Sequence, residues 1–220
     1  MIIISLLLAM HIAPGFHNEV IFYSPGLGTS TMPFTLKAGL DKAIAAAIVL
    51  SLMISRLQFQ GVGIFIQKDL PVMLTGIAGI LLTGYILGID LDIKFGQLTL
   101  AFAFFHFFVT CMAEEAFFRL LVQETLWQKL QKSPLRFLGP LAGQVNQYAG
   151  FIAFTLSASL FTLAHFHTGP GAMERMFLIF LAALLYAGIY WRTRSYITSV
   201  TAHFLLNFLH LSLFTYPATF

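Results

Sequence analysis

Long apolar stretches dominate this sequence and constrain its fold more than any other feature. A helix needs about 20 consecutive apolar residues to cross the hydrocarbon layer of a membrane. Six candidates lie at residues 38–56, 70–89, 98–124, 147–167, 174–191 and 196–215. The chain is 58% hydrophobic and 10% charged, against about 25% charged residues in a typical soluble domain. We therefore predict an integral membrane protein.

The N-terminal stretch MIIISLLLAMHIA is a seventh, ambiguous segment. It ends before Pro14, so it is a short or broken span, or a helix that continues towards Tyr23. It is unlike a signal peptide, because no Lys or Arg precedes it and no small-residue cleavage site follows. We therefore expect an all-α, polytopic transmembrane bundle of six or seven spans.

Positive charge is distributed unevenly between the two sides of the predicted membrane. The loops after residues 38–56, 98–124 and 174–191 are rich in Lys and Arg and hold a single acid, Asp69. Such loops are cytoplasmic in most membrane proteins. The net charge of +3 follows from these loops, so no nucleic-acid partner is expected. We expect an integral protein of the plasma (inner) membrane of a prokaryote, with the lipid bilayer as its surroundings.

Three charges interrupt the stretch at residues 98–124. An ionisable side chain at mid-bilayer costs about 2.5 to 3.5 kcal/mol, so it usually faces the protein interior and carries function. Glu115 and Arg119 are four residues apart and share a helix face, where they can pair. Glu114 points about 100° away and is predicted to be unpaired, as a general base would be. The alternative, that these charges only link neighbouring helices, does not need a second acid.

Two further polar pairs have helical spacing. LFTLAHFH places Phe161 four residues before His165, and TAHFLLNFLH places His203 four residues before Asn207. A single histidine in a membrane helix is usually hydrogen-bonded within the bundle, and we interpret His106 in that way. Glu, His, His and Asn from three helices would form either a water-activating proteolytic site or a metal site.

The order of these motifs resembles the CPBP family of intramembrane proteases, which includes CAAX prenyl proteases and bacteriocin-processing and immunity proteins. The motifs are EExxxR (Glu114, Glu115, Arg119), FxxxH (Phe161, His165) and HxxxN (His203, Asn207). The resemblance covers residues 98–213, about half of the chain. It implies N-terminal spans at 1–97 and a catalytic core of four helices at 98–215, within one integral membrane domain. It also implies that Glu115 and Arg119 form a structural pair, with Glu115 available as a second acid.

The same resemblance implies a mechanism. Glu114 would be the general base that activates water, and His165 would bind or orient that water. His203 and Asn207 would stabilise the oxyanion, a contribution of about 3 to 4 kcal/mol per donor in other proteases. Glu114, His165 and His203 are also an acceptable zinc set, so zinc or another divalent metal stays open. We favour a site without a cofactor, because Asn207 is a poor zinc ligand and a good oxyanion donor.

The position of His165 along the membrane is a difficulty for this site. The predicted spans place Glu114 and His203 on the cytoplasmic side of the midplane and His165 on the outer side, offset by on the order of 10 Å. A helix tilt of about 20°, or a span that runs on past His165, would close this gap. If neither holds, His165 is not in the site.

The resemblance predicts an enzyme but does not define its substrate. We expect an endopeptidase that acts on a membrane-associated protein or peptide through CAAX-like, leader-peptide or C-terminal sorting-signal processing. The alternatives are a non-proteolytic peptide-binding or bacteriocin self-immunity protein and an ion-coupled transporter. A transporter is disfavoured because the sequence has no internal repeat. Neither the substrate nor the oligomeric state follows from the sequence.

Overall fold

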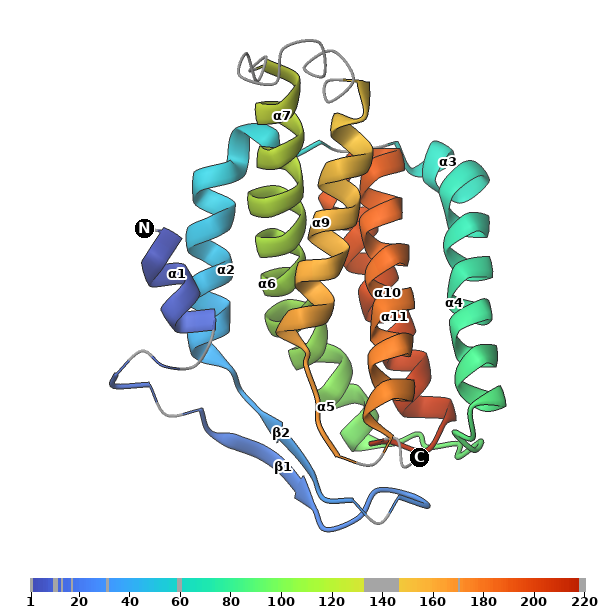
Figure 1. Cartoon of the computed structure of the whole chain (residues 1–220). Coiled ribbons are helices and arrows are strands. Elements are labelled where there is room, and N and C mark those ends of the chain that lie inside the picture. Colours follow the sequence, from blue (N-terminus) through green and yellow to red (C-terminus); the bar gives the residue numbers. More distant parts are fainter. Residues whose placement is uncertain are drawn as a thin grey trace.

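The computed structural model is a bundle of helices that run side by side, with a β-hairpin at one end (Figure 1). It describes residues 2–9, 12, 14–16, 18–30, 32–58, 61–132, 147–169 and 171–217. The first half contains α1 (Ile2–Ala9), β1 (Val20–Ser24), β2 (Phe34–Lys37), α2 (Leu40–Met53), α3 (Val62–Ile64) and α4 (Leu70–Ile86). The second half contains α5 (Gln97–Phe105), α6 (Met112–Glu115), α7 (Glu124–Lys132), α9 (Ala149–Ala164), α10 (Ala172–Thr193) and α11 (Tyr196–Leu213).

Three helices in the described part of the chain are long and apolar enough to cross a membrane. They are Val62–Ile86 with 25 residues, Gln97–Gln131 with 35 and Ala172–Thr193 with 22. Their outward surfaces are apolar, as Ile86 and Leu100 show with 74% and 73% exposure, and such surfaces suit contact with lipid. The expected helical membrane bundle is thus confirmed, whereas the number of six or seven spans and the division at residue 97 remain predictions.

π-helical turns interrupt the longest helix. They occupy His106–Cys111 and Ala116–Gln123 and join α5, α6 and α7 into one rod. A π-helical turn shifts the residues that share a helix face and is frequent at functional sites. Here the two turns flank Glu114 and Glu115.

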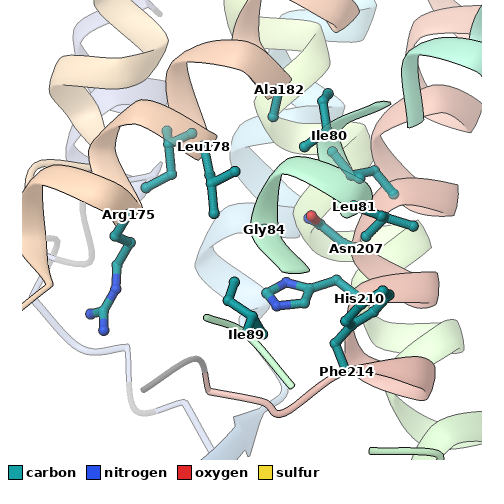
Figure 2. A pocket seen from close by; sticks show the side chains of 12 residues that line it. Ile80, Leu81, Gly84, Ile89, Arg175, Leu178, Ala182, Asn207, His210 and Phe214 are labelled. Carbon is teal, nitrogen blue, oxygen red and sulfur yellow. The ribbon is translucent and has the colours of Figure 1, made fainter. Parts of the chain in front are cut away.

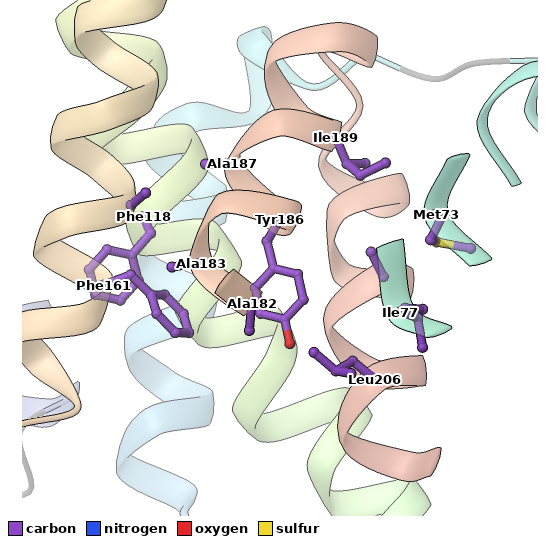
Figure 3. Close-up of a cluster of buried hydrophobic side chains, with 12 residues drawn as sticks. Met73, Ile77, Phe118, Phe161, Ala182, Ala183, Tyr186, Ala187, Ile189 and Leu206 are labelled. Atoms are coloured by element: carbon purple, nitrogen blue, oxygen red, sulfur yellow. The ribbon is translucent and has the colours of Figure 1, made fainter. Parts of the chain in front are cut away.

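The core lies between α4, α9, α10 and α11. Figure 3 shows Phe161 beside Phe118 on one side of α10 and Met73 on the other, with Tyr186 between them. Ala183 of α10 is fully buried. Small residues let membrane helices approach closely, and association in lipid depends on van der Waals packing and interhelical hydrogen bonds. This packing holds the polar groups of α9 and α11 in place.

A tight turn makes α10 and α11 antiparallel neighbours. α10 ends at Thr193 and is capped by Arg194, which has a left-handed backbone (φ 54°) and whose N–H donates to the carbonyl of Tyr190 at 2.8 Å. Ser195 then caps α11, its hydroxyl accepting from the N–H of Thr198 at 3.3 Å. A Ser at this position satisfies a helix-end donor, so the short TRS sequence reverses the chain without a long loop.

The N-terminus differs from the expectation. α1 has eight residues, about 12 Å long at 1.5 Å per residue, which is less than half of the roughly 30 Å hydrocarbon layer. Met1, Met10, His11 and Ala13 of the same segment lie outside the described residues. The proposed continuation as a helix towards Tyr23 is wrong, because Val20–Ser24 is a strand.

The β-hairpin also corrects the prediction of an all-α chain. β1 and β2 pair antiparallel with Ser24 opposite Phe34 and one irregularity of register. β2 alternates buried and exposed residues, the period expected of a strand with one covered face. Phe34 and Leu36 point into the bundle and pack with Phe102 and Leu211. This alternation covers only the four residues of FTLK, which is too short to predict a strand from the sequence alone.

The tip of the hairpin is tied to the loop between α4 and α5. The Asp92 carboxylate accepts from the N–H of Thr29 at 2.8 Å and from the Lys94 ammonium at 2.9 Å. Partial burial alone would raise the pKa of Asp92, but these two donors lower it below its ordinary value. Gly28 makes the approach possible: its φ is +60°, and a Cβ on it would lie 2.1 Å from Asp92 Oδ2.

We predict that Gly28→Ala lowers the free energy of unfolding by about 2 to 4 kcal/mol, through the left-handed backbone and the clash with Asp92. The matched control is Gly15→Ala, which has φ +88° and no atom within 4 Å of the added Cβ, so it isolates the backbone term. Thermal unfolding in detergent measures both. Equal losses in the two variants would show that the contact with Asp92 is unimportant.

Candidate active site

Glu114 lies near the middle of the long helix, and its two oxygens face different partners. Oε1 is 3.3 Å from Lys42 Nζ, and Oε2 is 3.5 Å from His165 Nε2 and 4.0 Å from His203 Nε2. The side chain is 13% exposed. The prediction that Glu114 is unpaired is therefore wrong, because α2 supplies a cation that sequence spacing did not reveal. One carboxylate oxygen of Glu114 thus contacts a lysine, and the other faces two imidazoles.

α9 delivers His165 to Glu114. It runs antiparallel to the long helix, and the Phe118 and Phe161 rings lie 4.9 Å apart. Because the helices are antiparallel, His165, four residues after Phe161, lies beside Glu114, four residues before Phe118. α9 ends at Ala164. The explanation that the span runs on past His165 is therefore wrong. His165 nevertheless lies beside Glu114, with Nε2 3.5 Å from Oε2, because the packing of the two helices brings them together.

His165 has a defined orientation. Its ring stacks on Phe161 at 4.4 Å, and its Nδ1 lies 2.8 Å from the Phe161 carbonyl oxygen. A carbonyl accepts hydrogen bonds only, so Nδ1 carries the proton and donates it. Nε2 faces the Glu114 carboxylate, 3.5 Å from Oε2. The FxxxH spacing thus provides both the stacking surface and the tautomer.

His203 is held between the two glutamates. Its Nδ1 lies 3.0 Å from Glu115 Oε1, and its ring stacks on Tyr186 at 4.4 Å. Ser199, one turn earlier on α11, donates its hydroxyl to Glu115 Oε2 at 2.5 Å. His203 is 2% exposed. Glu115 therefore orients the imidazole, as the carboxylate does in a catalytic triad, while Nε2 faces Glu114.

Glu115 and Arg119 form the expected pair. Arg119 Nε donates to Glu115 Oε2 at 2.8 Å, and both side chains are fully buried. The guanidinium also donates to the hydroxyl of Ser157 at 2.9 Å and contacts Gln123 Oε1 at 3.4 Å. A charge so deep in the protein needs such partners. The network joins the long helix to α9, and through Glu115 to α11.

Asn207 lies one turn beyond His203 and contacts His106 of the long helix. Its Nδ2 is 2.8 Å from His106 Nε2, and the His106 ring stacks on Phe102 at 4.5 Å. His106 and His203 rings are 6.1 Å apart. The interpretation of His106 as a histidine hydrogen-bonded within the bundle is confirmed, and its ring also lies near His203. Among the described residues, Asn207 makes no direct hydrogen bond to Glu114.

The sequence contained a signal for His106 but none for Lys42. Phe102 and His106 repeat the FxxxH spacing of Phe161 and His165, and both pairs stack. Lys42 lies at the start of α2, 72 residues before Glu114. Nothing in its local sequence indicates that contact.

A cavity of about 780 Å³ opens on Glu114 and His165. Its other polar lining is Lys42 and Ser5, and its walls are otherwise apolar, including Phe117 and Leu160. A pocket of this size and composition suits a largely apolar ligand with a few polar anchoring groups. It places the carboxylate at the wall of a chamber between α2 and α9.

A smaller cavity lies on the other side of α11. It measures about 130 Å³, and Figure 2 shows Asn207 and His210 turned towards it, beneath Gly84 of α4. His210 Nε2 is buried and has no hydrogen-bond partner among the residues described. Asn207 therefore borders this second cavity while it contacts His106.

The residues fit a divalent metal poorly. In the expected set, the imidazoles of His165 and His203 both face Glu114 Oε2. The Lys42 ammonium already contacts the same carboxylate through Oε1 and would repel a second cation. Elsewhere in the described chain, ligand atoms of His106, Cys111 and His203 lie within 4.8 Å of one another. His106 Nε2 contacts Asn207 and His203 Nδ1 contacts Glu115, so a metal would have to bind the other nitrogen of each ring.

The arrangement suits proton transfer to and from a water molecule. A carboxylate oxygen and an imidazole nitrogen that lie 3.5 Å apart can both hydrogen-bond to one water, and a geometry within hydrogen-bond reach is the first requirement for a general base. An apolar chamber strengthens the electrostatic interactions at such a site.

A family model described as type II CAAX prenyl endopeptidase, Rce1-like, matches residues 96–209, just over half of the 220 residues. The matched segment contains all six residues of the expected site and His106, whereas Lys42 lies before it. No match is found among curated proteins or among solved structures.

Proposed function

This chain belongs to the Rce1-like family of type II CAAX prenyl endopeptidases, and from that premise we propose that it is an intramembrane endopeptidase whose Glu114 activates water. The observation that carries the proposal is Glu114 Oε2, 3.5 Å from His165 Nε2 at the wall of an apolar cavity. The substrate is a peptide bond in a membrane-associated protein or peptide, processed in a CAAX-like, leader-peptide or sorting-signal manner. The protein would act in the plasma (inner) membrane of a prokaryote.

The proposed reaction begins with a water held by Glu114 Oε2 and His165 Nε2. Glu114 takes one proton, and the resulting hydroxide attacks the scissile carbonyl carbon. The C=O π electrons move to oxygen and form a tetrahedral oxyanion. Collapse of this intermediate breaks the C–N bond, and the proton on Glu114 passes to the leaving nitrogen. One water is consumed for each bond broken, and Glu114 returns to its carboxylate form.

His203 and Asn207 are the proposed oxyanion donors. His203 is oriented by Glu115, so in its imidazolium form Nε2–H can donate into the site. Asn207 uses one N–H on His106 and retains a second N–H. A preorganised donor of this kind contributes about 3 to 4 kcal/mol to the transition state. In this proposal Glu115 orients His203, and Arg119 links Glu115 to α9 through Ser157.

The test of this function compares protein termini in membrane and secreted fractions of cells that carry the intact chain or Glu114→Gln. We expect new termini that are present with the intact chain and missing with the variant, and they identify the substrate directly. Equal amounts of both proteins, checked by immunoblot, are the control. Identical termini at equal protein levels would contradict proteolysis and favour the peptide-binding or self-immunity alternative.

We further propose that hydrolysis needs no metal, because Lys42 occupies the side of Glu114 that a divalent ion would have to share. Dialysis of the purified protein against a strong chelator, followed by assay on the identified substrate, is expected to change kcat/KM by less than about two-fold. Loss of activity that zinc or another divalent metal restores would overturn this assignment.

A further inference from the structure

Lys42 is the charged residue of the site that lies outside the segment matched by the family model. Its Nζ is 3.3 Å from Glu114 Oε1, and its side chain is 25% exposed in the cavity that it lines. We propose that Lys42 is a positioning residue, which neutralises Glu114 and holds Oε1 so that Oε2 faces the histidines. This inference rests on the proposed role of Glu114 as the base.

The local sequence gives no reason for a lysine at this place. Lys42 lies in the first turn of α2, where the helix dipole disfavours a positive charge. Asp41, beside it, has the sign that suits a helix start. A residue placed against its local preference indicates a tertiary role, and here the tertiary partner is Glu114.

The start of α2 is built to approach the long helix. Gly39 precedes α2 with φ +60°, and a Cβ there would lie 3.0 Å from Val109 Cγ1. Asp41 is 1% exposed and accepts from Asn18 Nδ2 at 3.1 Å and from the N–H of Lys42 at 2.8 Å. These contacts fix the position of the Lys42 backbone, from which the Lys42 side chain extends to Glu114.

Each group around Glu114 has a distinct place. Lys42 approaches Oε1 from α2, whereas His165 from α9 and His203 from α11 approach Oε2. Glu115, next in the chain, is occupied by Arg119. Within the described ranges no other Lys or Arg is in ion-pair distance of Glu114. Without Lys42, the Glu114 carboxylate would face the cavity and two imidazoles with no cation to hold Oε1.

A double-mutant cycle on stability tests the pairing without any assay of activity. Lys42→Met, Glu114→Gln and the double variant are compared with the intact protein by thermal unfolding in detergent. We expect Lys42→Met to lower the unfolding midpoint by about 4 °C or more, because it leaves the mostly buried Glu114 carboxylate, 13% exposed, without its cation. In the Glu114→Gln background the same substitution should have a much smaller effect. Additive effects would overturn the proposal.

Kinetics on the substrate identified above tests the positioning role. Lys42→Met is expected to lower kcat by about 10- to 100-fold, the loss of one charge-assisted hydrogen bond, with little change in KM. Lys42→Arg, which keeps the charge, should recover most of kcat. The matched control is Lys37→Met, an exposed lysine at the end of β2, expected to behave as the intact protein. An unchanged kcat in Lys42→Met would overturn the positioning role.

The two experiments separate this inference from the proposed function. If the intact protein cleaves nothing, the proposed function and the catalytic part of the inference both fail, while the stability cycle still decides whether Lys42 and Glu114 are paired. If cleavage depends on Glu114 but the cycle is additive and Lys42→Met is fully active, the function stands and the inference is overturned.

Discussion

Replacing Glu114 by glutamine should reduce kcat by about 10²- to 10⁴-fold and leave the protein folded. The amide keeps the size of the side chain but cannot accept a proton from water, and general base catalysis contributes about 10² to 10⁴-fold. The Glu114 side chain faces a cavity, and the Lys42 ammonium that would lose its partner is 25% exposed in that same cavity, so the variant should remain folded. Purified protein, assayed on the identified substrate with unfolding followed in parallel, gives both quantities.

Two controls make this prediction specific. Glu19→Gln changes an exposed acid before the hairpin and should leave both rate and stability unchanged. Glu115→Gln changes the adjacent residue, which is fully buried with Arg119 and His203, and should lower stability as well as rate. A Glu114→Gln protein that retains more than about a tenth of the intact rate would show that another group activates the water.

Replacing Arg119 by methionine should have the largest effect on stability, a loss of about 3 to 5 kcal/mol. Methionine fills similar space, but it leaves the Glu115 carboxylate buried without its cation and leaves Ser157 without a donor. The corresponding fall in the unfolding midpoint is about 6 to 20 °C for a chain of this size. Thermal unfolding in detergent measures it.

The double variant Arg119→Met, Glu115→Gln should recover part of this loss, since the stranded charge is then removed as well. Lys129→Met, an exposed cation on α7, is the control and should change stability by less than about 0.5 kcal/mol. A loss below about 1 kcal/mol in Arg119→Met would mean that the network does not hold the long helix, α9 and α11 together.

The approximate path of the fold was predictable because apolar length is a local property. The stretches at 70–89, 174–191 and 196–215 correspond to α4, α10 and α11 within a few residues. The hairpin was not predictable in the same way. β2 has only four residues, and a strand that short is stabilised by its pairing with β1 and by Phe102 and Leu211 beneath it.

The site was predictable only where partners lie one helical turn apart. Glu115 with Arg119, and Phe161 with His165, follow from the spacing i, i+4. His106 followed the same rule but was set aside, because a single membrane histidine is usually structural. The depth of His165 could not be obtained from span lengths, since it depends on how α9 packs along the long helix.

The sequence by itself determined that this chain enters a membrane as helices and that two glutamates, an arginine and histidines lie within them. Hydrophobicity and residue chemistry are local, so they can be read without a fold. Only the tertiary structure decided that Lys42 meets one oxygen of Glu114 while His165 and His203 meet the other. These contacts join residues 51 to 89 positions apart in the printed sequence, and the physical reason is that helix register and packing, rather than spacing, bring them together.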